Sequence, residues 1–242
     1  CGSMLLVPME THMIASKPIL APAFSFLALI LAVALPLRPC LGQGTYNIIT
    51  YGADPTGVND SAAALRAAIN AARIAGGGKV IVPPGTYRLQ TTEPTDSTTH
   101  ARVTSRSITI EGVVARASQW PFVLQSTQGA ALVSYVPTAS IIKLAVTATE
   151  SPNAFTLANL RVDRDAAGTA PGLDFVDEVL ADNVASWVYE LHLSNVHFRN
   201  HGKGIATPWD ANGNRVRLSM ANIARCTFVG NSIGVEMLDW HE

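Results

Sequence analysis

The chain has 242 residues, a formal net charge of −1 at pH 7 and 14% charged residues. Its lysines and arginines are few and scattered, with no basic stripe, so the composition argues against nucleic acid as a partner. A chain of this length is expected to form one domain with a sizeable core after a leader is removed.

Residues 13–42 are predicted to be a secretory signal peptide. Lys17 supplies the positive start, an uninterrupted apolar run covers residues 24–35, and a small-residue site ends at Gly42, where we expect cleavage. A membrane anchor is the alternative. The apolar run is shorter than the roughly 20 residues that a span needs, so no stable membrane anchor is expected. Residues 1–12 are assigned to an upstream extension, and the domain is expected over residues 43–242.

Cys226 is the only cysteine of the mature chain that this cleavage would leave. A lipoprotein role for Cys40 is disfavoured, because Arg38 and Pro39 stand where small residues are expected. No intramolecular disulfide can then form, although export would permit one. The stability of the domain must therefore come from packing.

An alanine-rich segment over residues 61–75 predicts one helix. Asp60 is expected to cap its start and Gly76 to end it. The apolar face of this helix is formed by Leu65, Ala68, Ile69 and Ala72. A glycine run then leads into an expected first strand over residues 79–82, which Pro83-Pro84-Gly85 ends.

Three later segments share one apolar pattern: FTLANLRVD from Phe155, LHLSNVHFR from Leu191 and ANIARCTFV from Ala221. In each segment, apolar residues occupy the first, third, sixth and eighth places. Alternation with a period of two is typical of a strand with one buried face. The skipped place indicates a bend, after which both halves of the strand still face inward.

The skipped place is filled by Asn159, by Asn195 and, in the third copy, by Arg225. A residue at such a bend often takes a left-handed backbone conformation, which asparagine tolerates. A weaker fourth copy, SITIEGVVA from Ser107, has Gly112 at the bend.

The last two copies are 30 residues apart, and their register continues past the strands, through Gly204-Ile205 and Gly234-Val235. Repeats of this size, made of short bent strands, are what a β-solenoid requires, in which each coil stacks on the next. A β-sandwich is the main alternative, but it would not repeat one bend and one glycine at a constant offset. We predict an all-β solenoid whose single helix caps the first coil and covers its open edge.

The stretch YGADPTGVNDSAAALRAAINAARIAGGGKVIVPPGTYRL resembles the N-terminal segment of the pectate lyase superfamily. The resemblance implies a right-handed parallel β-helix, and that superfamily includes polygalacturonase-like and rhamnogalacturonase-like glycosidases and phage tailspikes. It covers roughly forty residues directly, and the coils from Ser107 onward share the repeating strand pattern without a specific sequence motif. Thr56 stands where relatives often have an acidic residue.

The resemblance also implies an extended acidic or neutral polysaccharide as the substrate class, but no reaction. The Asn-Thr-Asp, Asp-Asp, Gly-His-Gly and Arg-x-Lys motifs of polygalacturonase-like members do not occur in this sequence. The aspartate cluster with which pectate-lyase-like members bind calcium is not evident either. Fold alone does not fix function.

Hydrolysis of a glycosidic bond needs two carboxyl groups, one protonated and one ionised. The densest acidic stretch is an expected insertion between the first two copies, residues 163–190. Asp174, in the segment GTAPGLDF, is the first candidate, followed by Asp163 and Asp165, which we expect just past a strand end. The alternative is that these carboxylates solvate a long loop or form turns.

The candidate substrate-binding residues are aromatic and histidine side chains: Trp187, Tyr189, His197, His201 and Trp209. Aromatic rings stack on sugars, and a histidine beside carboxylates binds hydroxyls or moves protons. No metal site is expected, because two histidines four residues apart match metal-ligand spacing on a helix and not in strand and turn. Cys226 is interpreted as core packing, since its register points inward.

Two hypotheses follow. The first is a secreted or cell-surface enzyme, a glycoside hydrolase or polysaccharide lyase acting on pectin-like or other uronic-acid polysaccharide, with no cofactor except calcium if it is a lyase. The second is a non-catalytic polysaccharide-binding or adhesive β-helix module. No C-terminal cap is evident in the sequence, so we expect further coils in the parent protein.

Overall fold

The computed structural model describes residues 44–113, 129–179, 185–208 and 215–237. The predicted signal peptide and upstream extension lie outside the described residues. All described residues fall in one unit of the fold, Leu41–Glu242. Among them, no helix is long and apolar enough to cross a membrane.

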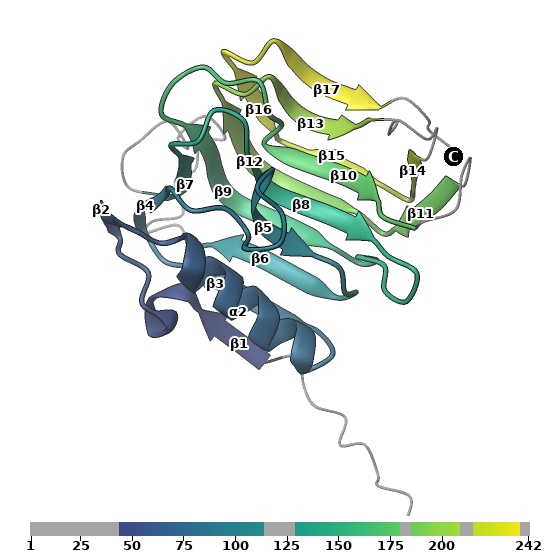
Figure 1. Cartoon of the computed structure of the whole chain (residues 1–242), viewed down its shortest axis with the longest axis horizontal. Helices are drawn as coiled ribbons and strands as arrows, with labels where there is room; N and C mark the ends of the chain where they lie inside the picture. Colours follow the sequence, from purple (N-terminus) through teal and green to yellow (C-terminus); the bar gives the residue numbers. More distant parts are fainter. Residues whose placement is uncertain (1–43, 114–128, 180–184, 209–214, 238–242) are drawn as a thin grey trace, which may run out of the picture. The chain divides into compact units, whose positions relative to one another are not determined.

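The described strands form three parallel sheets (Figure 1). The ten-stranded sheet contains β1 (Gly44–Asn47), β2 (Thr56–Asp60), β3 (Gly78–Val82), β4 (Gly85–Leu89), β6 (Ile108–Gly112), β7 (Ala130–Ser134), β9 (Thr156–Arg164), β12 (His192–Arg199), β15 (Asn222–Ala224) and β16 (Thr227–Val229). The five-stranded sheet contains β5 (Thr99–Val103), β8 (Ser140–Val146), β10 (Leu173–Asp177), β13 (Lys203–Thr207) and β17 (Ile233–Met237). The two-stranded sheet pairs β11 (Ala185–Tyr189) with β14 (Arg215–Ser219).

The sheets are the sides of stacked coils, which confirms the predicted parallel β-helix. One coil runs through β9, β10 and β11, and the next through β12, β13 and β14. Each strand pairs with its counterpart one coil later, so that Leu157 lies beside Leu193, and Phe198 lies beside Phe228. Residues 163–190, expected to be an insertion, instead supply β10 and β11, two sides of the coil.

The predicted bend is present in all three strong copies. Asn159, Asn195 and Arg225 have φ angles of 54°, 57° and 54°, all in the left-handed region. The asparagines also form a ladder: Asn195 Nδ2 donates to Asn159 Oδ1 at 2.9 Å, and Asn159 Nδ2 donates to Glu111 Oε1 at 3.3 Å. Gly112 is required beside this ladder, because a Cβ atom there would lie 2.0 Å from the carbonyl oxygen of Asn159.

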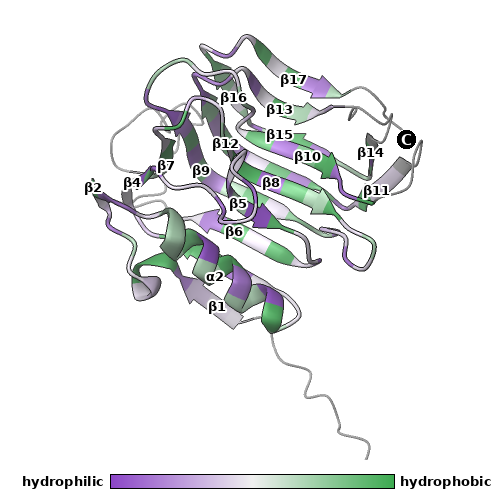
Figure 2. Ribbon diagram, in the orientation of Figure 1, coloured by the Kyte–Doolittle hydropathy of each residue, from purple (hydrophilic) through white to green (hydrophobic). Residues whose placement is uncertain are grey.

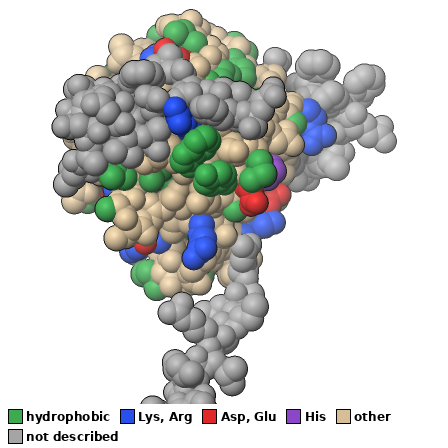
Figure 3. Space-filling model, turned by 90° about the vertical axis from the view of Figure 1, so that its right-hand side faces the viewer, with side chains coloured by type: hydrophobic (Ala, Val, Ile, Leu, Met, Phe, Trp, Pro, Cys, Tyr) green, Lys and Arg blue, Asp and Glu red, His purple; other side chains and the backbone are tan. Residues whose placement is uncertain are grey.

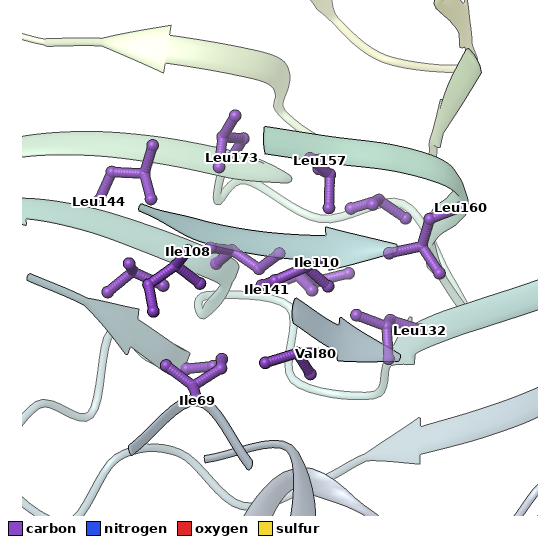
Figure 4. Packing of buried hydrophobic residues seen from close by; sticks show 14 of the residues in the cluster. Ile69, Val80, Ile108, Ile110, Leu132, Ile141, Leu144, Leu157, Leu160 and Leu173 are labelled. Atoms are coloured by element: carbon purple, nitrogen blue, oxygen red, sulfur yellow. The ribbon is translucent and has the colours of Figure 1, made fainter. Parts of the chain in front are cut away.

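Inward-facing side chains of successive coils form one apolar core. Figure 2 shows hydrophobic and hydrophilic residues alternating along the strands. Figure 4 shows Val80, Leu132 and Leu160 pointing into a common interior. The rings of Phe198 and Phe228 stack with centroids 5.3 Å apart. Cys226 packs against this core as a free thiol, as predicted.

The helix α2 (Ala62–Ile74) packs its predicted apolar face against the 3-10 helix η1 (Ile48–Tyr51) and the strands β1, β3, β5 and β6. Its N-cap is Ser61 and not Asp60, whose Oδ1 still accepts from the Ala62 N–H at 3.0 Å and from the Gln90 N–H at 3.0 Å. Gly76 follows the helix with a φ of 82°. The strand expected to be first is β3, which β1 and β2 precede. The role of α2 as a cap of the first coil stays a prediction.

Candidate functional site

Asp174 lies on the outer face of the five-stranded sheet. It alternates along β10 with Leu173 and Phe175, which are fully buried in the core, and strand alternation therefore turns its side chain outward. On β8, its register neighbour is Lys143, and on β13 it is Ala206. Asp174 therefore lies beside Lys143, which was not among the residues predicted for the site.

Lys143 is held in place by a second carboxylate. Its side chain is only 8% exposed and forms an ion pair with Asp96. Lys143 Nζ also donates to Thr98 Oγ1 at 2.7 Å. Asp96 is fixed by its own turn, because its Oδ1 accepts from the Thr98 N–H at 2.9 Å. Sequence reasoning missed Asp96, since an aspartate two residues before a threonine is an ordinary turn signal.

The two carboxyl groups differ in protonation behaviour. Burial raises the pKa of Asp174 to about 6, and nearby Asp96 adds to this rise, while Lys143 and Lys203 oppose it. For Asp96, burial acts to raise the pKa, but hydrogen bonds and charge from Lys143 and Thr98 together hold it below its ordinary value. Among the described residues, Asp174 forms no ion pair and its Oδ1 has no hydrogen-bond partner.

This split assigns two chemical roles. Carboxyl groups whose environments push their pKa values apart supply an acid and an ionised partner at the same pH. Asp174 retains a proton near pH 6, so it suits a general acid. Asp96 stays ionised and suits a base or a charge-stabilising group.

Charges continue along the same outer face. Lys203 of β13 forms an ion pair with Glu236 of β17, and Arg102 of β5 pairs with Glu178. These cations are already neutralised by carboxylates. Asp174 therefore differs from the other carboxylates of this face, which have cationic partners.

Asp163 lies at a different place, on the ten-stranded sheet. It was expected just past a strand end, but it is inside β9 and is 0% exposed. Arg161 contacts its Oδ2, and Arg199 Nη2 lies 3.4 Å from the same oxygen. Asp163 is a buried, doubly paired carboxylate and does not join Asp174. Asp165 does follow β9, as expected, and is exposed.

The two candidate histidines are enclosed. His197 faces outward at the predicted place, in register with Arg161 and Thr227, but is buried, with Nδ1 2.6 Å from Thr227 Oγ1. Burial lowers the pKa of His197. His201 is 1% exposed, its Nε2 lies 2.8 Å from the Val162 carbonyl oxygen, and burial lowers its pKa to about 4. Such burial does not fit the expected binding of sugar hydroxyls at a surface.

The two candidate aromatic residues lie together on β11. The rings of Trp187 and Tyr189 stack with centroids 5.8 Å apart and an interplanar angle of 14°. Arg217 of β14 lies over the Trp187 ring, 5.4 Å from its centroid, and Tyr189 is 41% exposed. Figure 3 shows hydrophobic side chains gathered near the middle of the face that lies on the right of Figure 1. Trp209 lies outside the described residues.

The three groups of candidates therefore occupy three sides of the coil, with Asp174 on β10, Asp163 and His197 on β9 and β12, and the aromatic pair on β11. The described part of the chain contains no group of three or more His, Cys, Asp or Glu side chains arranged to hold a metal ion.

Comparison with known proteins locates the resemblance in the N-terminal part. Residues 45–112 match the family described as rhamnogalacturonase A/epimerase, pectate lyase-like. This part of the chain is therefore pectate-lyase-like, as the sequence motif indicated.

Among curated proteins, the mannuronan C5-epimerases AlgE6 and AlgE1 of Azotobacter vinelandii are each 50% identical to this chain over 52 residues. That segment is 21% of this chain and 6% and 4% of those relatives, so the chain matches only a small part of their length.

Among solved structures, the A-module of AlgE6 is 16% identical, with a TM-score of 0.36, covering 81% of this chain and 75% of the module. The catalytic unit of a GH87 α-1,3-glucanase from Streptomyces thermodiastaticus is 20% identical, with a TM-score of 0.27, covering 81% of this chain and 40% of that unit.

Proposed function

We propose that this protein acts on a polysaccharide by acid–base chemistry at Asp174 and Asp96. The single observation that carries the proposal is the strand register that sets Asp174 beside Lys143, whose ion pair with Asp96 brings a second carboxyl group to the same face. The pectate-lyase-like segment and the C5-epimerase relatives, which are named for action on mannuronan, support a polysaccharide as the substrate class.

In the hydrolytic reaction, protonated Asp174 donates its proton to the glycosidic oxygen as the bond to the leaving sugar breaks. Ionised Asp96 stabilises the positive charge that develops on the sugar ring or accepts a proton from the attacking water. Lys143 orients Asp96 through their ion pair. The lysine also keeps Asp96 ionised while Asp174 is protonated, which is the protonation state that this reaction requires.

The substrate class we favour is pectin-like or other uronic-acid polysaccharide. The pectate-lyase-like segment supports this class, and Lys143 and Lys203, although each is paired with a carboxylate, act on the charge of Asp174 from neighbouring strands. A lyase would instead remove the proton next to the sugar carboxylate and leave an unsaturated product, and calcium would then assist by neutralising that carboxylate.

Purified protein incubated with a panel of acidic and neutral polysaccharides tests the proposal. New reducing ends without ultraviolet absorbance identify a hydrolase, and absorbance of an unsaturated product identifies a lyase. Asp174→Asn is expected to lower the rate at least a hundredfold while the fold is retained, since general acid catalysis contributes about 10²–10⁴-fold. Asp165→Asn is the matched control and should remain active. A fully active Asp174→Asn variant would remove Asp174 from the site.

The second function is a non-catalytic polysaccharide-binding module, which the aromatic pair on β11, with Tyr189 exposed, favours. Retention on polysaccharide without any product would support this function and contradict the catalytic one. Either function is consistent with the export that the sequence of residues 13–42 predicts, and secretion is part of this proposal.

A further inference from the structure

Two adjoining hollows lie between α2, the segment before β5 and the turns that follow β5 and β8. The first has a volume of about 570 Å³ and is lined by Arg66, Arg73 and Arg102 among others. The second, of about 380 Å³, includes Arg106 and Asn153. Arg73 and Glu150 line both hollows and form an ion pair at 3.3 Å. We call these two hollows together the side groove.

The side groove borders the aromatic pair on β11. Ser151 Oγ donates to the Trp187 carbonyl oxygen at 3.0 Å, and the Tyr189 N–H donates to Asn153 Oδ1 at 2.9 Å. Both Ser151 and Asn153 line the second hollow. The backbone of β11 therefore borders the groove, and Tyr189, which is 41% exposed, belongs to this border through its backbone N–H.

The lining of the side groove is richer in positive than in negative charge. It contains four arginines, Arg66, Arg73, Arg102 and Arg106, and two glutamates, Glu93 and Glu150. Two of these arginines are in ion pairs, Arg73 with Glu150 and Arg102 with Glu178.

The other two arginines have no carboxylate partner among the described residues. Arg66 Nη1 donates only to backbone carbonyl oxygens, those of Thr91 at 3.2 Å and His100 at 3.1 Å. This fixes the guanidinium at the groove wall without neutralising its charge. Arg106 is exposed, and the described part of the chain offers it neither an ion pair nor a hydrogen bond. A guanidinium in this condition is suited to bind a carboxylate of a ligand.

We propose that the side groove binds an acidic oligosaccharide, with a sugar carboxylate at Arg106 and a sugar ring against Tyr189. This inference deepens the proposed function because it assigns an additional subsite for the same class of substrate. The subsite is separate from the reacting carboxyl groups. Arg102 on the groove wall is two strands from Asp174 in the register of the outer face, about 10 Å away at the usual strand spacing. A long chain held in the groove therefore reaches Asp174.

Calorimetric titration with a galacturonate hexamer and with a neutral hexasaccharide tests the inference. Arg106→Gln is expected to weaken binding of the acidic hexamer at least tenfold, because it removes a charge-assisted hydrogen bond to the sugar carboxylate. Binding of the neutral hexasaccharide should stay unchanged. Arg225→Gln removes an exposed arginine at the bend between β15 and β16 and serves as the matched control.

A second variant, Tyr189→Ala, should weaken binding of both hexasaccharides about fivefold, since stacking on an aromatic face does not require the carboxylate. Three results would overturn the inference: unchanged binding by Arg106→Gln, equal weakening by Arg225→Gln, or no binding of the acidic hexamer by the unmodified protein at millimolar concentration. In the Asp174→Asn background, Arg106→Gln should weaken binding of the acidic hexamer as much as it does in the unmodified protein. Calorimetry therefore reports on the subsite and product formation on the proposed reaction, so failure of one is distinguished from failure of the other.

Discussion

Asp163 and Asp174 are both outward-facing aspartates on central strands, but their surroundings are opposite. Asp163 on β9 is contacted by Arg161 and Arg199, so its buried charge is neutralised. Asp174 on β10 has a raised pKa and, within the described residues, no ion pair. The first arrangement stabilises a fold, whereas the second keeps a proton available. A carboxylate's partners, and not its place in a strand, therefore indicate its role.

The largest expected effect is on stability at Asp163. Asp163→Ala should lower the free energy of unfolding by about 3 kcal/mol, because it leaves Arg161, 16% exposed, without its counter-charge. Urea unfolding followed by circular dichroism measures this change. Arg199→Ala is the control: this side chain is 42% exposed, and its loss should cost less than about 1 kcal/mol. Equal losses in both variants would contradict the assignment of Asp163 as the buried centre of this cluster.

The next effect concerns Asp174 and pH. Because its folded-state pKa is raised from 3.8 to about 6, its contribution to stability is fully present below pH 4 and is lost as the pH rises through 6. Asp174→Asn has no carboxyl group to ionise in this buried place, so it does not lose stability as the pH rises. Relative to the unmodified protein, it should gain about 2 kcal/mol in free energy of unfolding between pH 4 and pH 7, given 1.36 kcal/mol per pKa unit and partial solvation.

Unfolding at several pH values measures this difference, and Asp96→Asn supplies the opposite control. The pKa of Asp96 is lowered, so its contribution is present above pH 4 and is lost on acidification. Asp96→Asn should therefore be less stable than the unmodified protein at pH 7, and the difference should shrink toward pH 3. Parallel stability profiles for both variants would show that the two carboxyl groups do not have split pKa values.

A smaller effect is expected at the bend, away from both aspartates. Asn195→Ala should lower the free energy of unfolding by about 1–2 kcal/mol, because alanine is strained at a φ of 57° and the hydrogen bond to Asn159 is lost. Asn195→Gly keeps the backbone relaxed, so comparing the two variants by urea unfolding separates strain from the hydrogen bond. If the alanine variant is as stable as the glycine variant, the left-handed bend does not restrict which residue this position accepts.

Much of this fold could be predicted because its signal is local. The alternation around Asn159 and Asn195 fixes which residues face inward, and a stacked coil repeats that pattern. The strands β10 and β11 were missed as strands, because each has only five residues and no strong repeat partner in the sequence.

The candidate site was less predictable because its contacts are distant in sequence. Asp96 and Lys143 are 47 residues apart, and loops of unequal length hide the register of β5 and β8 that brings them together. The burial of His201 was missed because a turn position suggests exposure, whereas this turn packs its histidine against Val162 of the previous coil.

The smallest expected effect is at Asp165, which has neither the paired arginines of Asp163 nor the burial of Asp174. It is exposed after β9, and its backbone N–H, not its carboxylate, bonds to the Ser134 carbonyl oxygen at 3.0 Å. Asp165→Asn should change the free energy of unfolding by less than about 0.5 kcal/mol and leave activity on polysaccharide unaltered. Unfolding and reducing-end assays of this variant, run beside Asp163→Ala and Asp174→Asn, measure both quantities. An activity loss as large as that of Asp174→Asn would transfer the acid role to Asp165, because an exposed carboxylate with no structural partner has no other way to affect the rate.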